Sequence, residues 1–276
     1  MMDLHTHTFY SDGSDSPGEI VRMAKAKGLD LCAVSDHDCI DGLPEALAEG
    51  RAIGMPVLTG IEFDVENECE LHLLGYGFDP ENPALKSELS RQLIEREQRN
   101  GLIVEKLESM GIPLSVKRDS RGTLVSRTHL ADAIVRAGKA ETIQEAFDRY
   151  LGPGGSVRFD RKRMQPREAI SLIHEAGGLA VVAHPGLIRM RGEETLESLV
   201  EWGLDGIEAY YPRHTAHQIV FFCQMAMAKG LLITTGSDYH GAFRKNAKFA
   251  YIAELANREP RVQGTQARLL EMTQIW

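Results

Sequence analysis

The residues "MDLHTHT" (2–8) begin the chain with the pattern of a short strand and place two histidines two positions apart. Because successive side chains of a strand point to opposite faces, His5 and His7 would share one face, about 7 Å apart. Two imidazoles at one strand end can bind the same metal ion. Asp12 follows five residues later, in a predicted loop. Alone, this pattern would also suit an ordinary surface strand, so its meaning depends on the rest of the chain.

Six further apolar runs predict buried strands, and amphipathic segments separate several of them. Two of these segments carry helix start signals, one at Asp15-Ser16-Pro17 and one at Pro166. Alternation of strands and helices at this spacing predicts an α/β architecture, and a barrel suits it. The runs are LCAVSD (31–36), VLTGIEF (57–63), ELHLLGY (70–76), LAVVAH (179–184), GIEAYY (206–211) and LLITTGSD (231–238).

Residues 83–165 interrupt this alternation. They contain a long charged helical pattern at 84–111, followed by "THLADAIVRAG" (128–138) and "TIQEAFDRYLG" (142–152). No run comparable to the predicted strands occurs among them. We therefore predict a barrel domain of residues 1–82 and 166–276, and a helical insertion at 83–165 that covers the active site.

Composition narrows the class of protein. The chain has 276 residues, 43% of them hydrophobic and 26% charged, as in ordinary globular proteins. No apolar run approaches the roughly 20 residues of a membrane span, and no secretory signal is expected. The four scattered cysteines indicate reduced thiols, hence a cytoplasmic protein. A net charge of −9 argues against broad binding of long nucleic acid, although a small phosphorylated substrate remains compatible with it.

Histidine, aspartate or glutamate accompanies nearly every predicted strand. In barrels and open α/β sheets, the carboxyl ends of strands meet at one rim, where functional side chains gather. Within "SDHD" (35–38) we expect Asp36 to orient His37, and Asp38 to cap the next helix. The candidate metal ligands are His5, His7, Asp12, His37, Glu62, His72, His184, Asp238 and His240.

Imidazole and carboxylate ligands without thiolate are typical of sites for Mn, Zn or Fe. One ion takes roughly four to six ligands, so about nine candidates indicate two or three divalent ions. Centres with several ions catalyse hydrolysis, because they lower the pKa of a water molecule and neutralise the attacking and leaving oxygens. We expect hydrolysis of phosphoesters, with hydrolysis of amides as a remote alternative.

Five motifs together resemble the PHP (polymerase and histidinol phosphatase) family. They are HTHTFYSDG (5–13), SDHD (35–38), GIEF (60–63), AHPG (183–186) and GSDYH (236–240). The resemblance implies a distorted seven-stranded (β/α)7 barrel with a trinuclear metal centre. It implies one ion on His5, His7, Glu62 and Asp238, a second on Glu62, His72 and His184, and a third on Asp12, His37 and His240.

A narrower resemblance points to the subgroup that contains the 3′,5′-nucleoside bisphosphate phosphatases and the 5′→3′ exoribonuclease RNase AM. Where that subgroup commonly has Gly-Arg-Pro-His, this chain has Ser126-Arg127-Thr128-His129. The resemblance implies that Arg127 and His129 contact the substrate phosphate or base. The segments that carry it are SRTHLADAIVRAG (126–138), EAFDRYLGPGG (145–155), EAISLIHEAGGLAVVAHPG (168–186) and GLDGIEAYYP (203–212).

The leading hypothesis is a metal-dependent phosphoesterase that acts on small nucleotides or short RNA, with catalytic roles for Asp238, His240, Arg127 and His129. Arg127 would contact phosphate through two N–H groups, while His129, His240 or a water molecule would protonate the leaving oxygen. Histidinol phosphate phosphatase is the alternative enzyme. A non-catalytic metal-binding PHP module is the alternative from another class. The oligomeric state is left open.

Several other polar residues have simpler interpretations. His174 falls within a helical pattern and is expected to be structural. His214 and His217 are expected on a solvated surface, with substrate contact as the alternative. The charged run "RFDRKRM" (158–164) is also expected on a solvated face, and guidance of a nucleotide's phosphates is its alternative role.

Overall fold

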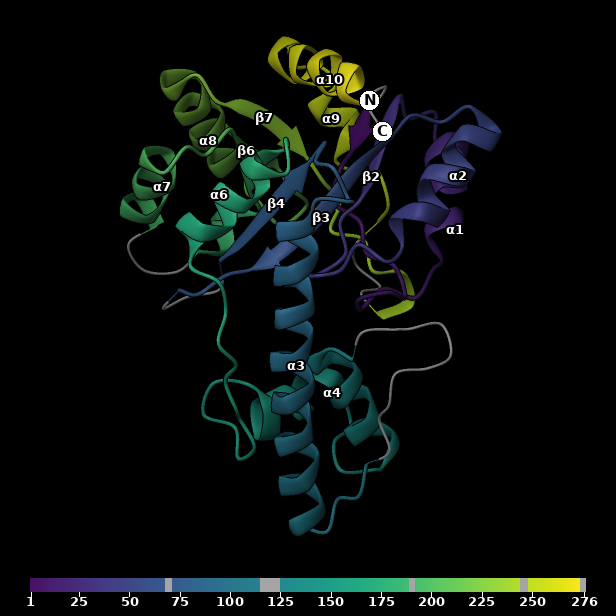
Figure 1. Ribbon diagram of the computed structural model, residues 1–276, viewed down its shortest axis with the longest axis vertical. Coiled ribbons are helices and arrows are strands. Elements are labelled where there is room, and N and C mark those ends of the chain that lie inside the picture. Colours follow the sequence, from purple (N-terminus) through teal and green to yellow (C-terminus); the bar gives the residue numbers. More distant parts are fainter. Residues whose placement is uncertain (68–70, 115–124, 189–191, 244–247, 274–276) are drawn as a thin grey trace.

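Seven strands follow one another around one sheet in chain order, within the residues that the computed structural model describes: 1–67, 71–114, 125–188, 192–243 and 248–273 (Figure 1). This is the predicted seven-stranded α/β barrel. The strands are β1 (Met2–Asp3), β2 (Leu31–Val34), β3 (Val57–Asp64), β4 (His72–Tyr76), β5 (Leu179–Val182), β6 (Gly206–Tyr210) and β7 (Leu232–Thr235).

Hydrogen bonds between the two ends of the sheet close the barrel. The amide of Leu4 donates to the carbonyl of Thr235 at 3.1 Å, and the amide of Asp238 donates to the carbonyl of His5 at 2.8 Å. The first strand therefore lies beside the last, which brings "HTH" next to "GSDYH". Two motifs from opposite ends of the chain, which His5 and Asp238 represent here, thus share one rim.

Strand β4 runs antiparallel to both of its neighbours, while the other strand pairs are parallel. Only residues 65–71 connect β3 to β4, and so short a connection cannot hold the crossover that a parallel pair requires. His72 is consequently the first residue of its strand and pairs with Asp64, near the end of β3. The reversal puts the start of β4 at the rim where the other strands end.

Helices cover the outside of the barrel, and their ends show the expected signals. Ser16 caps α1 in a capping box with Glu19, as predicted. The helix α2 begins after Gly42, so Asp38 does not cap it. The helices of this layer are α1 (Pro17–Ala26), α2 (Leu43–Ile53), α6 (Pro166–Glu175), α7 (Gly192–Glu201), α8 (Ala216–Lys229), α9 (Ala253–Ala256) and α10 (Pro260–Met272), with short 3-10 turns at Pro185–Leu187 and Gly241–Phe243.

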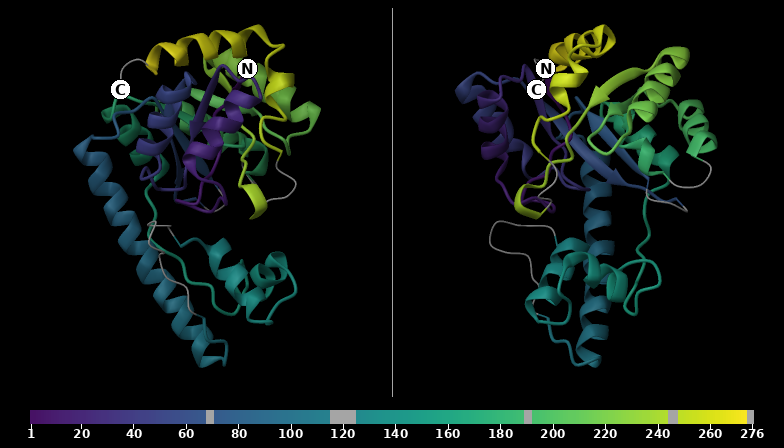
Figure 2. Two further views of the ribbon diagram at one scale, coloured as in Figure 1. Left: turned by 90° about the vertical axis from the view of Figure 1, so that its right-hand side faces the viewer. Right: turned by 180° about the vertical axis from the view of Figure 1, so that it is seen from behind.

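A second group of helices lies beyond the rim of the barrel that is remote from both chain ends (Figures 1 and 2). It has its own hydrophobic core, in which Ile103 and Leu107 pack with Leu130 and Ile134. That residues 83–165 form an insertion covering the active site stays a prediction. The helices are α3 (Pro83–Ser109), α4 (Arg127–Arg136), α5 (Ile143–Ala146) and the π-helical turn η1 (Phe147–Leu151).

Buried ion pairs connect these helices to the barrel. Asp38 adopts a left-handed φ of 49°, and its carboxylate accepts hydrogen bonds from Arg96 of α3 and Arg161. Arg161 also donates to Asp64 of β3 at 3.1 Å. The predictions for these residues were wrong: Asp38 binds guanidinium groups instead of capping a helix, and Arg161, within "RFDRKRM", is 6% exposed. Both predictions failed because charged side chains that are far apart in the sequence pair with one another in the folded structure.

Two simpler expectations were also tested. Cys32, Cys39 and Cys223 are free thiols, while Cys69 lies outside the described residues. Among the described helices, none has both the length and the apolar character needed to cross a bilayer.

Replacing Asp38 should destabilise the fold strongly. Asp38→Ala leaves the buried guanidinium of Arg161 with less compensating charge, so we expect a loss of about 3–5 kcal/mol in the free energy of unfolding. Glu49→Ala removes the surface ion pair with Arg22 and should cost about 0–1 kcal/mol. Urea denaturation of both variants measures the contrast. Equal, small losses would contradict the structural role of Asp38.

Candidate metal centre

The barrel rim brings together the nine predicted ligands. They form four overlapping groups, and within each group the ligand-type atoms lie within 4.8 Å of one another. The strands thus place side chains from residues 5 to 240 around one centre. The groups are His7, Asp12, His37 and His240; His5, His7 and Asp238; His5, Glu62 and His184; and His37, Glu62 and His72.

Glu62 is at the middle of the cluster, on β3. Its Oε2 lies 3.2 Å from the Nε2 of His5, 3.3 Å from the Nε2 of His7 and 3.1 Å from the Nδ1 of His37. Its Oε1 lies 2.8 Å from the Nδ1 of His72 and 3.1 Å from the Nε2 of His184. One carboxylate therefore faces five imidazoles from four parts of the chain, because His5 and His7 share one strand end.

Two further carboxylates flank this arrangement. The Oδ1 of Asp238 lies 3.3 Å from the Nε2 of His7. On the other side, the Oδ1 of Asp12 lies 3.2 Å from the Nε2 of His240 and 3.9 Å from the Nε2 of His37. His7 lies between the two carboxylates, so it could bind a metal ion together with either Asp238 or Asp12.

The cluster fits a set of divalent cations. In the described part of the chain, five buried atoms that face one another have no hydrogen-bond partner of acceptable geometry: His5 Nε2, His7 Nε2, Asp12 Oδ1, Glu62 Oε2 and His240 Nε2. Buried polar atoms are nearly always satisfied, because burial without a partner is costly. Imidazole nitrogens and carboxylate oxygens converging in this way satisfy a cation, so the cluster is able to bind metal.

Electrostatics put the carboxylates in the ligating form. Burial alone would raise the pKa of Glu62, but the surrounding imidazoles, led by His37, hold it well below its usual range. Burial lowers the pKa of His37 itself to about 3, an effect that Glu62 and Asp12 only partly offset. Burial also lowers the pKa of His7, but the nearby carboxylates of Asp238 and Glu62 outweigh this and raise it to about 9. A bound cation would displace that proton.

Glu208 orients two of the histidines, and the sequence reasoning missed it. Its Oε1 lies 3.0 Å from the Nδ1 of His5, and its Oε2 accepts the amide of His184 at 2.7 Å. A carboxylate on the far ring nitrogen fixes the tautomer and the angle of a ligating histidine. The available signal was one acidic residue inside the apolar run "GIEAYY".

Tyr211 and His214 form hydrogen bonds that hold a ligand of the cluster and the turn after another ligand. The hydroxyl of Tyr211 donates to the Oδ2 of Asp238 at 2.8 Å. His214 is 8% exposed, and its Nε2 accepts the amide of Gly186 at 3.0 Å, which holds the turn after His184. The solvated position predicted for His214 was wrong, because it precedes α8 and folds back under β6.

The remaining predictions for nearby polar residues had mixed outcomes. Asp36 does not orient His37; it accepts the amide and hydroxyl of Thr8 at 2.8 and 2.6 Å and so fixes the loop that carries Asp12. His217 is exposed, as predicted. His174 is structural, because its Nε2 lies 2.8 Å from the Oδ2 of Asp205.

The start of α4 reaches the cluster. Thr128, at the position where the related subgroup commonly has proline, donates its hydroxyl to the Oδ2 of Asp12 at 3.4 Å. Arg127 donates to the carbonyl of Phe159 at 3.1 Å, and the Nδ1 of His129 accepts the amide of Ser126 at 3.1 Å. Both predicted substrate residues therefore belong to a helix turn that touches a predicted ligand.

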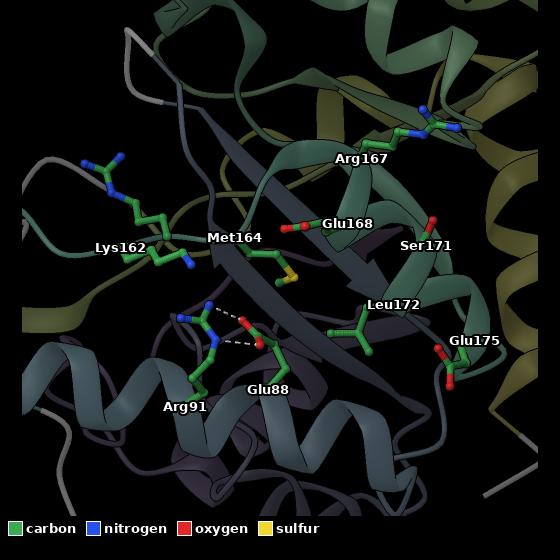
Figure 3. A pocket seen from close by; sticks show the side chains of 10 residues that line it. Glu88, Arg91, Lys162, Met164, Arg167, Glu168, Ser171, Leu172 and Glu175 are labelled. Atoms are coloured by element: carbon green, nitrogen blue, oxygen red, sulfur yellow. Dashed lines mark hydrogen bonds and ion pairs between the residues drawn. The ribbon is translucent and has the colours of Figure 1, made fainter.

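A separate pocket of about 550 Å³ lies between α3 and α6 (Figure 3). Its charged lining includes the ion pair of Arg91 with Glu88 together with Lys162, Arg167 and Glu168. None of the nine ligands lines it, so this pocket is distinct from the cluster.

Comparison with known proteins identifies the family. Residues 3–195 match the model of the PHP domain. The chain belongs to the PHP family. The ligand cluster thus lies at the strand ends of a PHP barrel, and the predicted membership of this family is confirmed.

Relatives in this family match nearly the whole chain. A 5′-3′ exoribonuclease of Haemophilus influenzae is 36% identical, over 86% of this chain and 89% of its own length. A 3′,5′-nucleoside bisphosphate phosphatase of Chromobacterium violaceum is 34% identical, over 87% of both chains. A phosphoribosyl 1,2-cyclic phosphate 1,2-diphosphodiesterase of Eggerthella lenta is 33% identical, over 87% of this chain and 94% of its own.

A solved PHP-like structure has the same fold. The crystal structure of a putative metal-dependent phosphoesterase from Bifidobacterium adolescentis superposes with a TM-score of 0.82 at 30% identity, covering 91% of each chain. The PHP barrel described above therefore recurs in a protein of similar length.

Removing the charge of Glu208 should weaken metal binding without dismantling the PHP barrel. We expect Glu208→Gln to bind divalent metal about 10- to 100-fold more weakly, because His5 loses its carboxylate partner. Competitive titration with a fluorescent chelator measures this. The exposed Glu254→Gln is the matched control. Unchanged affinity in Glu208→Gln would contradict the orienting role.

Proposed function

We propose that this protein hydrolyses phosphate esters of small nucleotides or of short RNA ends at a cluster of two or three divalent ions, chosen from Mn, Zn and Fe. It is a phosphoester hydrolase of the PHP family. The observation that carries the proposal is the position of Glu62, whose two oxygens face five imidazoles between the carboxylates of Asp12 and Asp238.

The proposed ligands divide among the ions as the resemblance to the PHP family implies. His5, His7, Glu62 and Asp238 would hold one ion; Glu62, His72 and His184 a second; and Asp12, His37 and His240 a third. Divalent ions at these positions supply Lewis acidity, which lowers the pKa of water and neutralises charge on a phosphate. His7 lies 3.3 Å from Asp238 and 3.9 Å from Asp12, so it stands between the residues proposed for the first ion and those proposed for the third.

Arg127 and His129 are the proposed substrate residues of α4. The guanidinium of Arg127 is anchored by Phe159 and partly exposed, so it can offer N–H groups to a phosphate. The Nδ1 of His129 accepts a hydrogen bond, so in the neutral ring the proton is on Nε2. The Nε2–H of His129 can therefore donate a hydrogen bond to a leaving oxygen, whereas both nitrogens of His240 face cluster residues.

The relatives support a substrate with phosphate on ribose. Their names describe an exoribonuclease, a nucleoside bisphosphate phosphatase and a ribosyl cyclic phosphate diphosphodiesterase. Histidinol phosphate remains the alternative substrate, and a non-catalytic module the alternative from another class. The cysteine pattern supports a location in the cytoplasm, where thiols stay reduced.

A substrate panel tests the proposed function. Adenosine 3′,5′-bisphosphate, a 5′-phosphorylated oligoribonucleotide, a ribosyl cyclic phosphate and histidinol phosphate are each assayed for kcat/KM with Mn²⁺, Zn²⁺ or Fe²⁺ added. We expect a ribose ester to be the best substrate. Preference for histidinol phosphate would favour the alternative enzyme, and no turnover with any ester would favour the non-catalytic module.

Activity should depend on bound metal. Incubation with a chelator followed by its removal should abolish phosphate release, since the histidines and carboxylates alone supply no Lewis acid. Addition of one of the three metals should restore release, and elemental analysis of the active enzyme should give two or three ions per chain. Full activity in metal-free protein would refute the metal-dependent mechanism.

Asp238→Ala should remove nearly all turnover and leave the fold intact. We expect kcat/KM to fall by roughly 10³-fold or more, because a lost ligand removes several kcal/mol of charge stabilisation. The control is Asp132→Ala, which removes an aspartate on the surface of α4 that pairs with Arg136. Circular dichroism checks both variants. Activity near wild type in Asp238→Ala would mean that the ligand assignment is wrong.

A further inference from the structure

The two carboxylate oxygens of Asp12 have different surroundings. Its Oδ1 faces the cluster, 3.2 Å from the Nε2 of His240, 3.9 Å from the Nε2 of His37 and 3.9 Å from the Nδ1 of His7. In the described part of the chain this buried oxygen has no hydrogen-bond partner of acceptable geometry. The Oδ2 instead accepts the hydroxyl of Thr128 at 3.4 Å. One oxygen is therefore left for a cation, while the protein itself holds the other.

The barrel fixes the main chain of Asp12 without help from the helices beyond the rim. The amides of Ser11 and Gly13 donate to the carbonyl of Thr8 at 3.1 and 2.9 Å, so the residue between them lies in a tight loop. Asp36 accepts the amide and hydroxyl of Thr8 at 2.8 and 2.6 Å and anchors this loop near the end of β2. These hydrogen bonds leave the rotation of the carboxylate to be set by other contacts.

The rotation of this carboxylate is restricted from α4. Among the described residues, Thr128 is the donor to the Oδ2 of Asp12, and a hydrogen bond to one oxygen of a ligating carboxylate orients the whole group. Thr128 is the second residue of α4, and Ser126 and His129 form a capping box around it. Leu130 anchors the same turn in the core of the second group of helices. The hydroxyl therefore reaches Asp12 from a turn whose own position is fixed.

We propose that Thr128 is a positioning residue, whose hydroxyl keeps the Oδ1 of Asp12 facing His37 and His240. This inference rests on the proposed function, which assigns the third ion to these three ligands. Proline, which the related subgroup commonly has at position 128, carries no hydroxyl. The contact thus comes from a residue in which this chain differs from the subgroup. The affinity for the third ion would depend on the barrel and on α4 together.

The contact also couples the third ion to the proposed substrate residues. Arg127 and His129 flank Thr128 in the first turn of α4, so the hydrogen bond fixes where this turn lies relative to Asp12. Because linkage is reciprocal, an ion that binds more tightly when α4 is in place also holds α4 in place. Filling of the third site would therefore favour the position of both substrate residues at the rim.

Metal binding by Thr128 variants tests the proposal without any substrate. Equilibrium dialysis against graded concentrations of free Mn²⁺ or Zn²⁺, followed by elemental analysis, gives the number of bound ions and their affinities. Thr128→Val keeps the shape of the side chain but lacks the hydroxyl. We expect it to bind one ion about 10- to 100-fold more weakly than the wild type and the other ions equally well. Thr128→Ser keeps the hydroxyl and should bind all ions like the wild type, as should the matched control Thr195→Val on α7.

Four outcomes of this titration overturn the inference. Thr128→Val may bind every ion like the wild type, or it may bind all of them equally weakly, as expected for a merely structural residue. Thr128→Ser may show the same loss as Thr128→Val, so that the hydroxyl does not matter. Finally, the wild type may bind only two ions, so that no third site exists.

Thermal unfolding separates metal binding from folding. Without metal, Thr128→Val should unfold close to the temperature of the wild type, because one partly exposed hydrogen bond contributes little to stability. Addition of Mn²⁺ should raise its unfolding temperature by less than that of the wild type, since the stabilisation follows metal affinity. A variant that is strongly destabilised without metal and gains as much from Mn²⁺ as the wild type would indicate a structural threonine and overturn the inference.

The binding measurements are independent of turnover, so the two proposals can fail separately. If no ester is hydrolysed but one ion binds more weakly to Thr128→Val, the proposed function fails and the positioning role stands. If esters are hydrolysed and the metal affinities of Thr128→Val equal those of the wild type, the proposed function stands and the positioning role fails.

Discussion

The carboxylate of Glu62 is the interaction on which the rest of the site depends. Five imidazoles surround it, and they come from four separate strand ends or loops that the folded barrel brings together. Repulsion among so many buried polar groups would oppose folding if they faced one another without compensation. A cation at the centre resolves this conflict, which is why the donor set, the burial and the unsatisfied atoms all point to metal.

The reversed strand is the structural device that completes this arrangement. A (β/α) unit would place the start of β4 at the opposite end of the barrel, far from the other ligands. The seven-residue connection excludes a crossover helix, so β4 returns antiparallel and delivers His72 to the Oε1 of Glu62. Behind the histidines, Glu208 and Tyr211 hold His5 and Asp238 at fixed angles. The geometry of the centre is therefore set by residues that touch no ion themselves.

Charge also organises the approach to the centre. Asp38 and Asp64 belong to the barrel, and they form ion pairs with arginines of α3 and of the segment before α6. This buried network joins the second group of helices to the barrel beside the ligands.

Much of this could be predicted from the sequence by itself. The apolar runs and helix caps determined seven strands in an α/β barrel, and the motif order determined all nine residues of the cluster, because side-chain alternation and strand ends are local properties. Three features could not be predicted: the pairing of Asp38 with Arg161, the burial of His214, and the hydrogen bonds that Asp36 accepts from Thr8. Each depends on which distant groups the closed barrel brings within hydrogen-bond distance. The role of Glu208 was missed for the same reason: what a buried charge does depends on its neighbours in space, and only the tertiary structure determines which residues these are.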